Sequence, residues 1–256
     1  MENRFATVIM AAGKGTRMKN SEKAKVMFEV AGKPMIHHVV ELAVALHSSR
    51  VIAIVGHYRE AVIEYLRRDA PTVEFAVQDP QLGTGHAVMQ AKDSLLNFNG
   101  DVLVLSGDVP LLHVSTIRSL ISFHHEKEAV ATILTADLAD PTGYGRVLRG
   151  SGDNVTGIVE HKDATEEERN VKEINSGIYI FDNLHLFDAL AHITTNNVQH
   201  EYYLTDVFNY FWKHGMKVAA KKAVDFDEVR GVNTVEQLEE ADRILRKRNS
   251  TSAPHV

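Results

Sequence analysis

The chain has 256 residues, of which 44% are hydrophobic and 24% are charged, a composition typical of a globular protein with a substantial core. Its formal net charge of −6 argues against a partner such as nucleic acid or an anionic membrane. The absence of cysteine excludes disulfides, thiol catalysis and thiolate metal sites. No apolar run approaches the length of a transmembrane helix, so the sequence favours a cytoplasmic protein without membrane contact.

The first half of the chain alternates between strand-like and helix-like patterns. Short apolar or β-branched runs predict strands at 5–10, 51–55, 73–78, 101–106 and 129–136. Helical patterns lie between them at 35–46, 58–68, 85–96 and 115–127. This alternation predicts an α/β fold with a mainly parallel, Rossmann-like sheet that is flanked by helices.

The pattern changes after residues 140–145. Shorter strands are expected at 146–149, 155–160 and 174–181, which indicates a small antiparallel insertion beside the main sheet. Two helices (184–190, 203–214) and a strand (216–223) follow, and residues 166–169 are expected to form a solvated helical face. A capping-box pattern begins the last helix at Thr234, with Gln237 three residues later. Its expected apolar face consists of Val235, Leu238, Ala241 and Leu245.

A glycine-rich loop directly follows the first predicted strand. Gly13 and Gly15 allow close backbone approach to a ligand, and Arg17 and Lys25 add positive charge, so the loop predicts a site for a nucleoside triphosphate. The alternative is a tight turn that binds nothing. The Walker spacing is absent, and Met18 occupies the place where a dinucleotide-binding loop needs a small residue.

Other chemically suggestive residues follow later strands. Asp108 comes directly after residues 101–106, as a Mg²⁺ ligand would, although it could instead cap the turn into Val109. Gln78 and the glycine-rich segment 83–85 could read the edge of a base, or could form only a strand-to-helix turn. Glu160 and Asn175 suit the hydroxyls of a sugar, with solvent exposure on an edge strand as the alternative. The 14 histidines show no metal-binding spacing.

Several long motifs together resemble the sugar-nucleotidyltransferase family over residues 5–245. Within it, the closest resemblance is to the N-acetylglucosamine-1-phosphate uridylyltransferase half of bifunctional bacterial members. The motifs are at 11–18, 81–87, 141–146, 158–165 and 201–206. The resemblance implies one nucleotidyltransferase domain at 1–248, followed by a disordered tail at 249–256. Within the domain, 1–136 would mainly bind the nucleotide, 137–233 the sugar, and 234–248 would form a closing helix.

The resemblance also implies a role for individual residues. Arg17 and Lys25 correspond to the catalytic pair that stabilises phosphate charge, and Asp108 and Asn233 to the Mg²⁺ ligands. The nucleotide would be bound by Met10, Ala11, Ala12, Gly13, Gln78, Gly83, Thr84, Ser106 and Gly107. The sugar would be held by Gly145, Glu160 and Asn175.

Two positions depart from the family pattern. Ala24 stands where proline is usual before the lysine, which would loosen the loop. Ser106 stands where close relatives commonly carry tyrosine, which leaves the choice of sugar less defined than that of the nucleotide. The bifunctional members continue into a β-helix, and no hexapeptide repeat occurs in this sequence, so a free-standing enzyme is expected.

The implied activity joins UTP and N-acetylglucosamine 1-phosphate, with Mg²⁺ as cofactor, and releases pyrophosphate. One alternative is an enzyme for another sugar 1-phosphate or another base. A second alternative is a non-catalytic protein that binds UDP-sugars.

Overall fold

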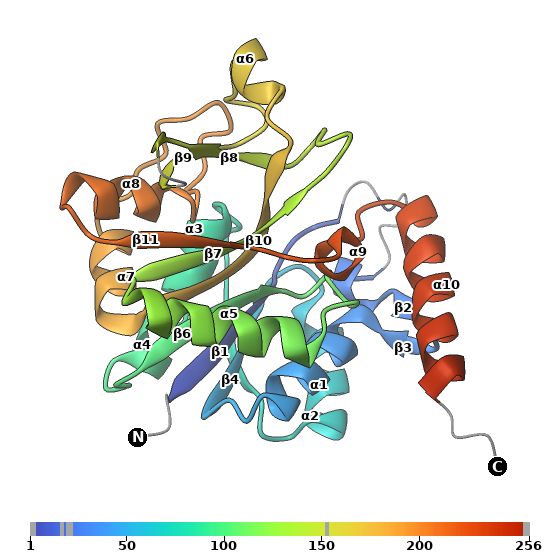
Figure 1. Cartoon of the computed structure of the whole chain (residues 1–256). Coiled ribbons are helices and arrows are strands. Elements are labelled where there is room, and N and C mark those ends of the chain that lie inside the picture. The colour runs from blue at the N-terminus through green and yellow to red at the C-terminus, as the bar shows by residue number, and fades with distance from the viewer. Residues whose placement is uncertain (1–3, 16–17, 19–22, 152–153, 253–256) are drawn as a thin grey trace.

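The computed structural model describes residues 4–15, 18, 23–151 and 154–252. Over these residues a nine-stranded mixed sheet lies between two layers of helices (Figure 1). The main strand order is β11-β7-β10-β6-β1-β4-β5, and β8 and β9 extend the sheet from β10. The strands of this sheet are β1 (Phe5–Ala11), β4 (Arg50–Val55), β5 (Glu74–Val77), β6 (Asp101–Ser106), β7 (Ala131–Asp137), β8 (Gly145–Arg149), β9 (Val155–Val159), β10 (Glu173–Asp182) and β11 (Val218–Lys222).

The predicted parallel sheet is confirmed for four neighbouring strands, β6, β1, β4 and β5. β1 pairs in parallel with both β4 and β6, and β4 pairs in parallel with β5. β10 runs antiparallel to β6, β7 and β8, and β8 runs antiparallel to β9. The predicted antiparallel insertion is therefore present, and it is joined to the main sheet through β10.

Helices cover both faces of the sheet because its central strands are apolar on both sides. Along β1, Val8 faces one core cluster and Ile9 the other, as expected for a strand whose side chains alternate. Helices α1, α2 and α5 pack on the Ile9 side, and α3, α4, α7 and α8 on the Val8 side. The bounds of these helices are α1 (Met35–Ala45), α2 (Arg59–Asp69), α3 (Thr84–Met89), α4 (Lys92–Leu95), α5 (Val114–Lys127), α7 (Asn183–Leu190) and α8 (Asp206–Lys213).

One helix prediction is wrong in its continuity. The pattern at 85–96 predicted a single helix, but a turn at Gln90–Ala91 divides it into α3 and α4. Both pieces still bury their apolar side chains, including Val88 and Leu95, in one cluster. The predicted solvated helix at 166–169 is confirmed as α6 (Glu166–Arg169), which has a capping box formed by Thr165 and Glu168.

The last helix packs against a small hairpin that the sequence did not predict. The 3₁₀-helix η2 (Lys25–Met27) leads into β2 (Glu29–Val30) and β3 (Lys33–Pro34), and α10 (Val235–Ser252) lies beside them (Figure 1). The short helix α9 (Phe226–Val229), also not predicted, precedes α10.

The expected start of α10 is confirmed by reciprocal hydrogen bonds between Thr234 and Gln237. Leu238, Ala241 and Leu245 face the core as expected, whereas Val235 is 40% exposed, so its assignment to the apolar face is wrong. The helix continues through Ser252, into the segment 249–256 that was expected to be a disordered tail. That expectation stays a prediction, and 253–256 lie outside the described residues. No helix in the described part of the chain is long and apolar enough to cross a membrane.

Candidate active site

A cavity of about 440 Å³ lies at the carboxyl ends of β1, β5 and β6, the edge at which open α/β sheets bind ligands. The structure brings most of the residues predicted for nucleotide and metal binding to this one cavity. Those that line it are Met10, Ala11, Ala12, Gly13, Lys25, Gln78, Gly83, Thr84, Ser106, Asp108 and Asn233.

The glycine loop that follows β1 forms one wall of the cavity. Gly15 has a φ of +64°, and a Cβ there would lie 2.6 Å from Lys25 Cβ, so glycine is required both by conformation and by packing. Gly13 is exposed, and among the described residues no atom beyond its two chain neighbours lies within 4 Å of the position that its Cβ would take. The loop therefore keeps an open backbone surface toward the cavity, as phosphate binding requires.

Three charged or polar side chains from distant segments meet in the cavity. Lys25 forms an ion pair with Asp108, and its Nζ donates a hydrogen bond of 2.7 Å to Asn233 Oδ1. Asp108 follows β6, and Asn233 precedes α10, where its own backbone N–H donates to Gln237. The ammonium group of Lys25 thus lies between the two predicted metal ligands, where it neutralises their negative and partial negative charge.

These residues fit Mg²⁺ by the chemistry of their donor atoms. Mg²⁺ prefers hard oxygen ligands and takes one or two from the protein, with phosphate and water oxygens completing the shell. Asp108 offers a carboxylate and Asn233 an amide oxygen. No group of three or more acidic, histidine or cysteine side chains that could hold a metal occurs in the described part of the chain. Among the described residues, Asp108 and Asn233 are therefore the best candidates for metal ligands, with oxygens of the substrate supplying further ligands.

The loop after β5 is held by side-chain and backbone hydrogen bonds. Gln78, which is 3% exposed, donates from Nε2 to Gly83 O at 2.8 Å. Gly83 has a φ of +109°, and a Cβ there would lie 2.5 Å from Tyr202 O. Thr84 Oγ1 accepts a hydrogen bond of 3.0 Å from Leu204 N. Gln78 therefore fixes the loop that faces the cavity, and residues 202–204 pack against this loop and hydrogen-bond to it.

The three residues predicted to bind the sugar also lie together, although they do not line the cavity itself. Asn175 on β10 pairs with Gly145 on β8. A Cβ at Gly145 would lie 3.4 Å from Glu160 Oε2 and 3.5 Å from Asn175 Cβ, so glycine leaves the space between the two side chains open. The Asn175 amide is oriented by a 2.7 Å hydrogen bond from Nδ2 to the buried hydroxyl of Tyr179.

Glu160 lies near two other carboxyl groups, those of Asp163 and Asp206. Burial raises the pKa of its carboxyl, and the charges of Asp163 and Asp206 raise it further, while a hydrogen bond from Thr205 acts in the opposite direction. Thr205 Oγ1 donates to Glu160 Oε1 at 3.1 Å. Leu204, in the same 201–205 segment, donates to Thr84 in the loop after β5. The segment therefore connects the residues predicted to bind the nucleotide with those predicted to bind the sugar.

Not every predicted site residue lies where it was expected. Gly107 does not line the cavity; its N–H donates to Met10 O at 2.9 Å, and a Cβ there would meet Met10 O at 3.1 Å, so it packs closely against β1. Its role in nucleotide binding stays a prediction. Arg17, predicted to be catalytic, lies outside the described residues. Ala24 has φ −58° and ψ 139°, values that proline also adopts, so the departure from proline leaves a proline-like backbone.

The structure adds several lining residues to which the sequence assigned no individual binding role, although Gly15 was already part of the predicted glycine loop. These are Lys14, Gly15, Val26, Gln81, Ala87 and Glu201. Gln81 and Glu201 lie in the motifs that carry the family resemblance, which is the signal that could have identified them. Glu201 reaches the cavity because Tyr202 N donates to Leu82 O and Gly85 N donates to Tyr202 O, both at 2.8 Å.

A mainly parallel α/β sheet with a glycine loop and a cavity at its carboxyl edge is an architecture typical of nucleotide-binding proteins. The chain belongs to the nucleotidyl transferase family, whose model matches residues 6–232. Over nearly its whole length the fold also resembles a solved UDP-glucose pyrophosphorylase complexed with UDP-glucose, with a TM-score of 0.77 at 18% sequence identity; the match covers 96% of this chain and 99% of that one.

Curated relatives match this chain at much higher identity. "Bifunctional protein GlmU" from Streptococcus agalactiae serotype V is 50% identical over 241 residues, which is 94% of this chain and 52% of that protein. The protein of the same name from Halalkalibacterium halodurans is 49% identical over 248 residues, 97% of this chain and 53% of that protein. The chain thus spans about half the length of these relatives.

Proposed function

We propose that this chain is a Mg²⁺-dependent uridylyltransferase that joins UTP to N-acetylglucosamine 1-phosphate and releases pyrophosphate. The observation that carries the proposal is the meeting of Lys25, Asp108 and Asn233 in the cavity that the glycine loop and the Gln78 loop also line. Sequence identities of 50% and 49% to relatives named bifunctional protein GlmU support UTP and N-acetylglucosamine 1-phosphate as the substrates. A UTP-consuming reaction in a cysteine-free chain supports a cytoplasmic location.

Catalysis would rest on positioning and charge stabilisation. The second pKa of a phosphate monoester lies near ~6, so the sugar phosphate is largely ionised at neutral pH and needs no strong general base. Its oxygen would attack the α-phosphorus of UTP in line, and pyrophosphate would leave on the opposite side. This fits a site that offers backbone amides and a lysine, with no nucleophilic serine–histidine or cysteine–histidine pair among the lining residues.

The residues divide this work between them. Backbone N–H groups of residues 13–15 would orient the phosphates, and Lys25 would donate to a phosphate oxygen once substrate is bound. Mg²⁺, held by Asp108 and Asn233, would offset charge on the phosphate oxygens. Arg17 remains a predicted phosphate-stabilising residue on the strength of the motif at 11–18.

Selectivity would come from two sets of side chains. The loop that Gln78 fixes, with Gly83 and Thr84, would face the uracil, and a buried amide and backbone groups discriminate well between base edges. Gly145, Glu160 and Asn175 would hold the N-acetylglucosamine unit, since a carboxylate and an amide match sugar hydroxyls and the acetamido group.

A pyrophosphate-release assay across nucleotides and sugar phosphates tests the proposal. We expect the highest kcat/KM for UTP with N-acetylglucosamine 1-phosphate, and loss of turnover when Mg²⁺ is omitted. A different preferred pair would identify another sugar nucleotidyltransferase. Binding of UDP-N-acetylglucosamine without pyrophosphate release from any pair would instead identify a non-catalytic binding protein.

A further inference from the structure

The β8–β9 hairpin is attached to the main sheet by a short ladder. β8 pairs with β10 at two positions, Arg146 opposite Ile174 and Gly145 opposite Asn175. The second of these pairs consists of two residues proposed to bind the sugar. A slip of one residue turns every side chain of a strand to the other face, so the register of these few positions decides whether the sugar cluster exists.

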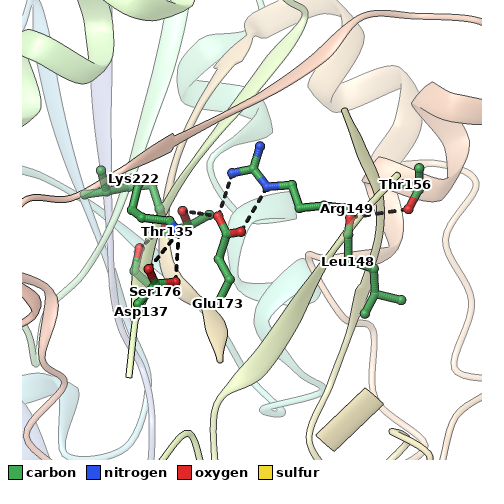
Figure 2. A network of polar contacts seen from close by, with 9 residues as sticks. Thr135, Asp137, Leu148, Arg149, Thr156, Glu173, Ser176 and Lys222 are labelled. Atoms are coloured by element: carbon green, nitrogen blue, oxygen red, sulfur yellow. Dashed lines mark hydrogen bonds and ion pairs between the residues drawn. The ribbon is translucent and has the colours of Figure 1, made fainter. Parts of the chain in front are cut away.

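A buried carboxylate connects the strands on both sides of this short ladder. Arg149 on β8 donates to Glu173 on β10 through two hydrogen bonds, Nε to Oε2 at 2.9 Å and Nη2 to Oε1 at 2.6 Å (Figure 2). Thr135 on β7 donates to Glu173 Oε1 at 2.6 Å. The Glu173 side chain is 9% exposed and that of Arg149 is 21% exposed. One carboxylate therefore fixes three strands to each other.

The geometry of the Arg149–Glu173 contact indicates that it fixes the register of β8 on β10 rather than adding much to the stability of the fold. Two parallel N–H···O bonds from a planar guanidinium are charge-assisted and directional. A partly buried ion pair gives little net stability, because both charges lose water, and its best attested role is to specify register. Although burial alone would raise the pKa of Glu173, the hydrogen bonds from Arg149 and Thr135 lower it, so the carboxylate stays ionised and keeps its partners.

The pairing of β8 with β9 makes the position of Glu160 depend on the register of β8. Thr156 on β9 donates to Leu148 O on β8 at 3.3 Å (Figure 2). Arg146 on β8 lies opposite Val159 on β9. Glu160 directly follows Val159, so its position depends on where β8 is held. A fault in the attachment of β8 would displace Gly145 and Glu160 together, relative to Asn175.

We propose that Glu173, acting through Arg149, is a positioning residue for the sugar 1-phosphate subsite. It touches no substrate; it sets the register of β8 on β10 and so the relative placement of Gly145, Glu160 and Asn175. The proposal rests on the proposed function, in which these three residues hold the sugar. It predicts that loss of the pair weakens the use of the sugar phosphate and leaves the use of UTP intact.

The test compares two ion pairs of the same sheet. Glu173→Gln removes the charge at nearly constant shape, and Asp137→Asn does the same for the Lys222–Asp137 pair, whose side chains are about half exposed (Figure 2). For Glu173→Gln we expect KM for N-acetylglucosamine 1-phosphate to rise about tenfold, as a small misplacement of binding groups would cause, with KM for UTP unchanged. Asp137→Asn should change neither value.

Two further variants test whether Arg149 and Glu173 act together. Arg149→Lys keeps the charge but loses the bidentate geometry, and should give a smaller, equally sugar-selective rise. The double variant Glu173→Gln/Arg149→Lys should have a KM for N-acetylglucosamine 1-phosphate no higher than that of the more impaired of its two single variants, because the two residues act as a unit. Equal changes in both KM values, or no change in either with an active wild type, would overturn the proposal.

Hydrogen exchange separates a failure of this inference from a failure of the proposed function. Amides of β8 should exchange at least about tenfold faster in Glu173→Gln than in wild type, with β1 and β6 unchanged. A wild type that releases no pyrophosphate contradicts the proposed function, and the exchange data then decide the register role alone. Unchanged exchange in β8 would show that Glu173 does not hold it.

Discussion

Lys25 Nζ donates a hydrogen bond of 2.7 Å to Asn233 Oδ1, although 208 positions of sequence separate the two residues. The same ammonium group pairs with Asp108. It therefore occupies the space between the two residues that would hold Mg²⁺. A divalent cation bound at the proposed site would compete with the lysine for these oxygens, and the lysine would turn to a phosphate when substrate and metal arrive.

Replacement of Lys25 by methionine tests this competition. Without substrate, Mn²⁺ used as a probe should bind about tenfold more tightly to Lys25→Met, since no ammonium has to leave the ligand oxygens. Turnover should fall by about 10²-fold or more, because a phosphate contact is lost. Calorimetry or electron paramagnetic resonance measures the affinity. Lys14→Met, which removes another charge lining the cavity, is the control, and an equal gain in that variant would refute direct competition.

Replacement of Asp108 by alanine tests the metal assignment. We expect Mg²⁺-dependent turnover to fall by at least about 10²-fold, because the only proposed carboxylate ligand is lost. Circular dichroism should show an intact fold, since Asp108 lies at the cavity and outside the core clusters. Asp93→Ala, on the surface of α4, should behave as wild type. Wild-type turnover in Asp108→Ala would remove Asp108 from the site.

Burial of Glu160 predicts a pH-dependent gain of stability in Glu160→Gln. A glutamate in an unfolded chain has a pKa of about 4.3, and burial raises the pKa of Glu160 above that in the folded protein. Folding therefore becomes less favourable as the pH rises through this window, because the folded state resists ionisation. Glu160→Gln removes that penalty, so its melting temperature should exceed that of wild type at pH 8 and approach it at pH 4. Glu166→Gln, on the exposed face of α6, should show no such trend.

Replacement of Gly83 by alanine separates backbone strain from steric overlap. Gly83 has a φ of +109°, and a Cβ there would lie 2.5 Å from Tyr202 O. Gly143 has a φ of +85°, and in the described part of the chain only its sequence neighbours would lie within 4 Å of an added Cβ. Gly143→Ala should lower the free energy of unfolding by about 1–3 kcal/mol through strain. Gly83→Ala should lower it further and raise KM for UTP as well, which urea unfolding and initial rates would measure. Equal losses in the two variants would contradict close packing at Gly83.

The sheet and much of the cavity could be predicted because their signals are local. β6 coincides with the predicted strand at 101–106, where an unbroken apolar run ends at Ser106, Gly107 and Asp108. Parallel strands bring their carboxyl ends to one edge, so residues that follow separate strands could be expected to meet there. The closeness of Asn233 to Asp108 came from the family resemblance, since no local pattern links them.

The features that were missed depend on tertiary contacts. The apolar pattern at 85–96 is continuous, and the turn that separates α3 from α4 has no proline or glycine to mark it. Glu201 enters the cavity through backbone hydrogen bonds between Tyr202 and the 82–85 loop, more than 100 positions away. Glu173 was not singled out from the sequence, because its partners Arg149 and Thr135 are identified only when three strands are in place.

The proposed reaction requires that the α-phosphorus of UTP is the atom attacked. Parallel reactions of the wild-type chain with N-acetylglucosamine 1-phosphate and UTP labelled with ³²P at either the α or the γ position test it directly. We predict that the α label appears in UDP-N-acetylglucosamine and the γ label in pyrophosphate. Transfer of the γ label to the sugar phosphate, or release of the γ label as free phosphate, would contradict the account.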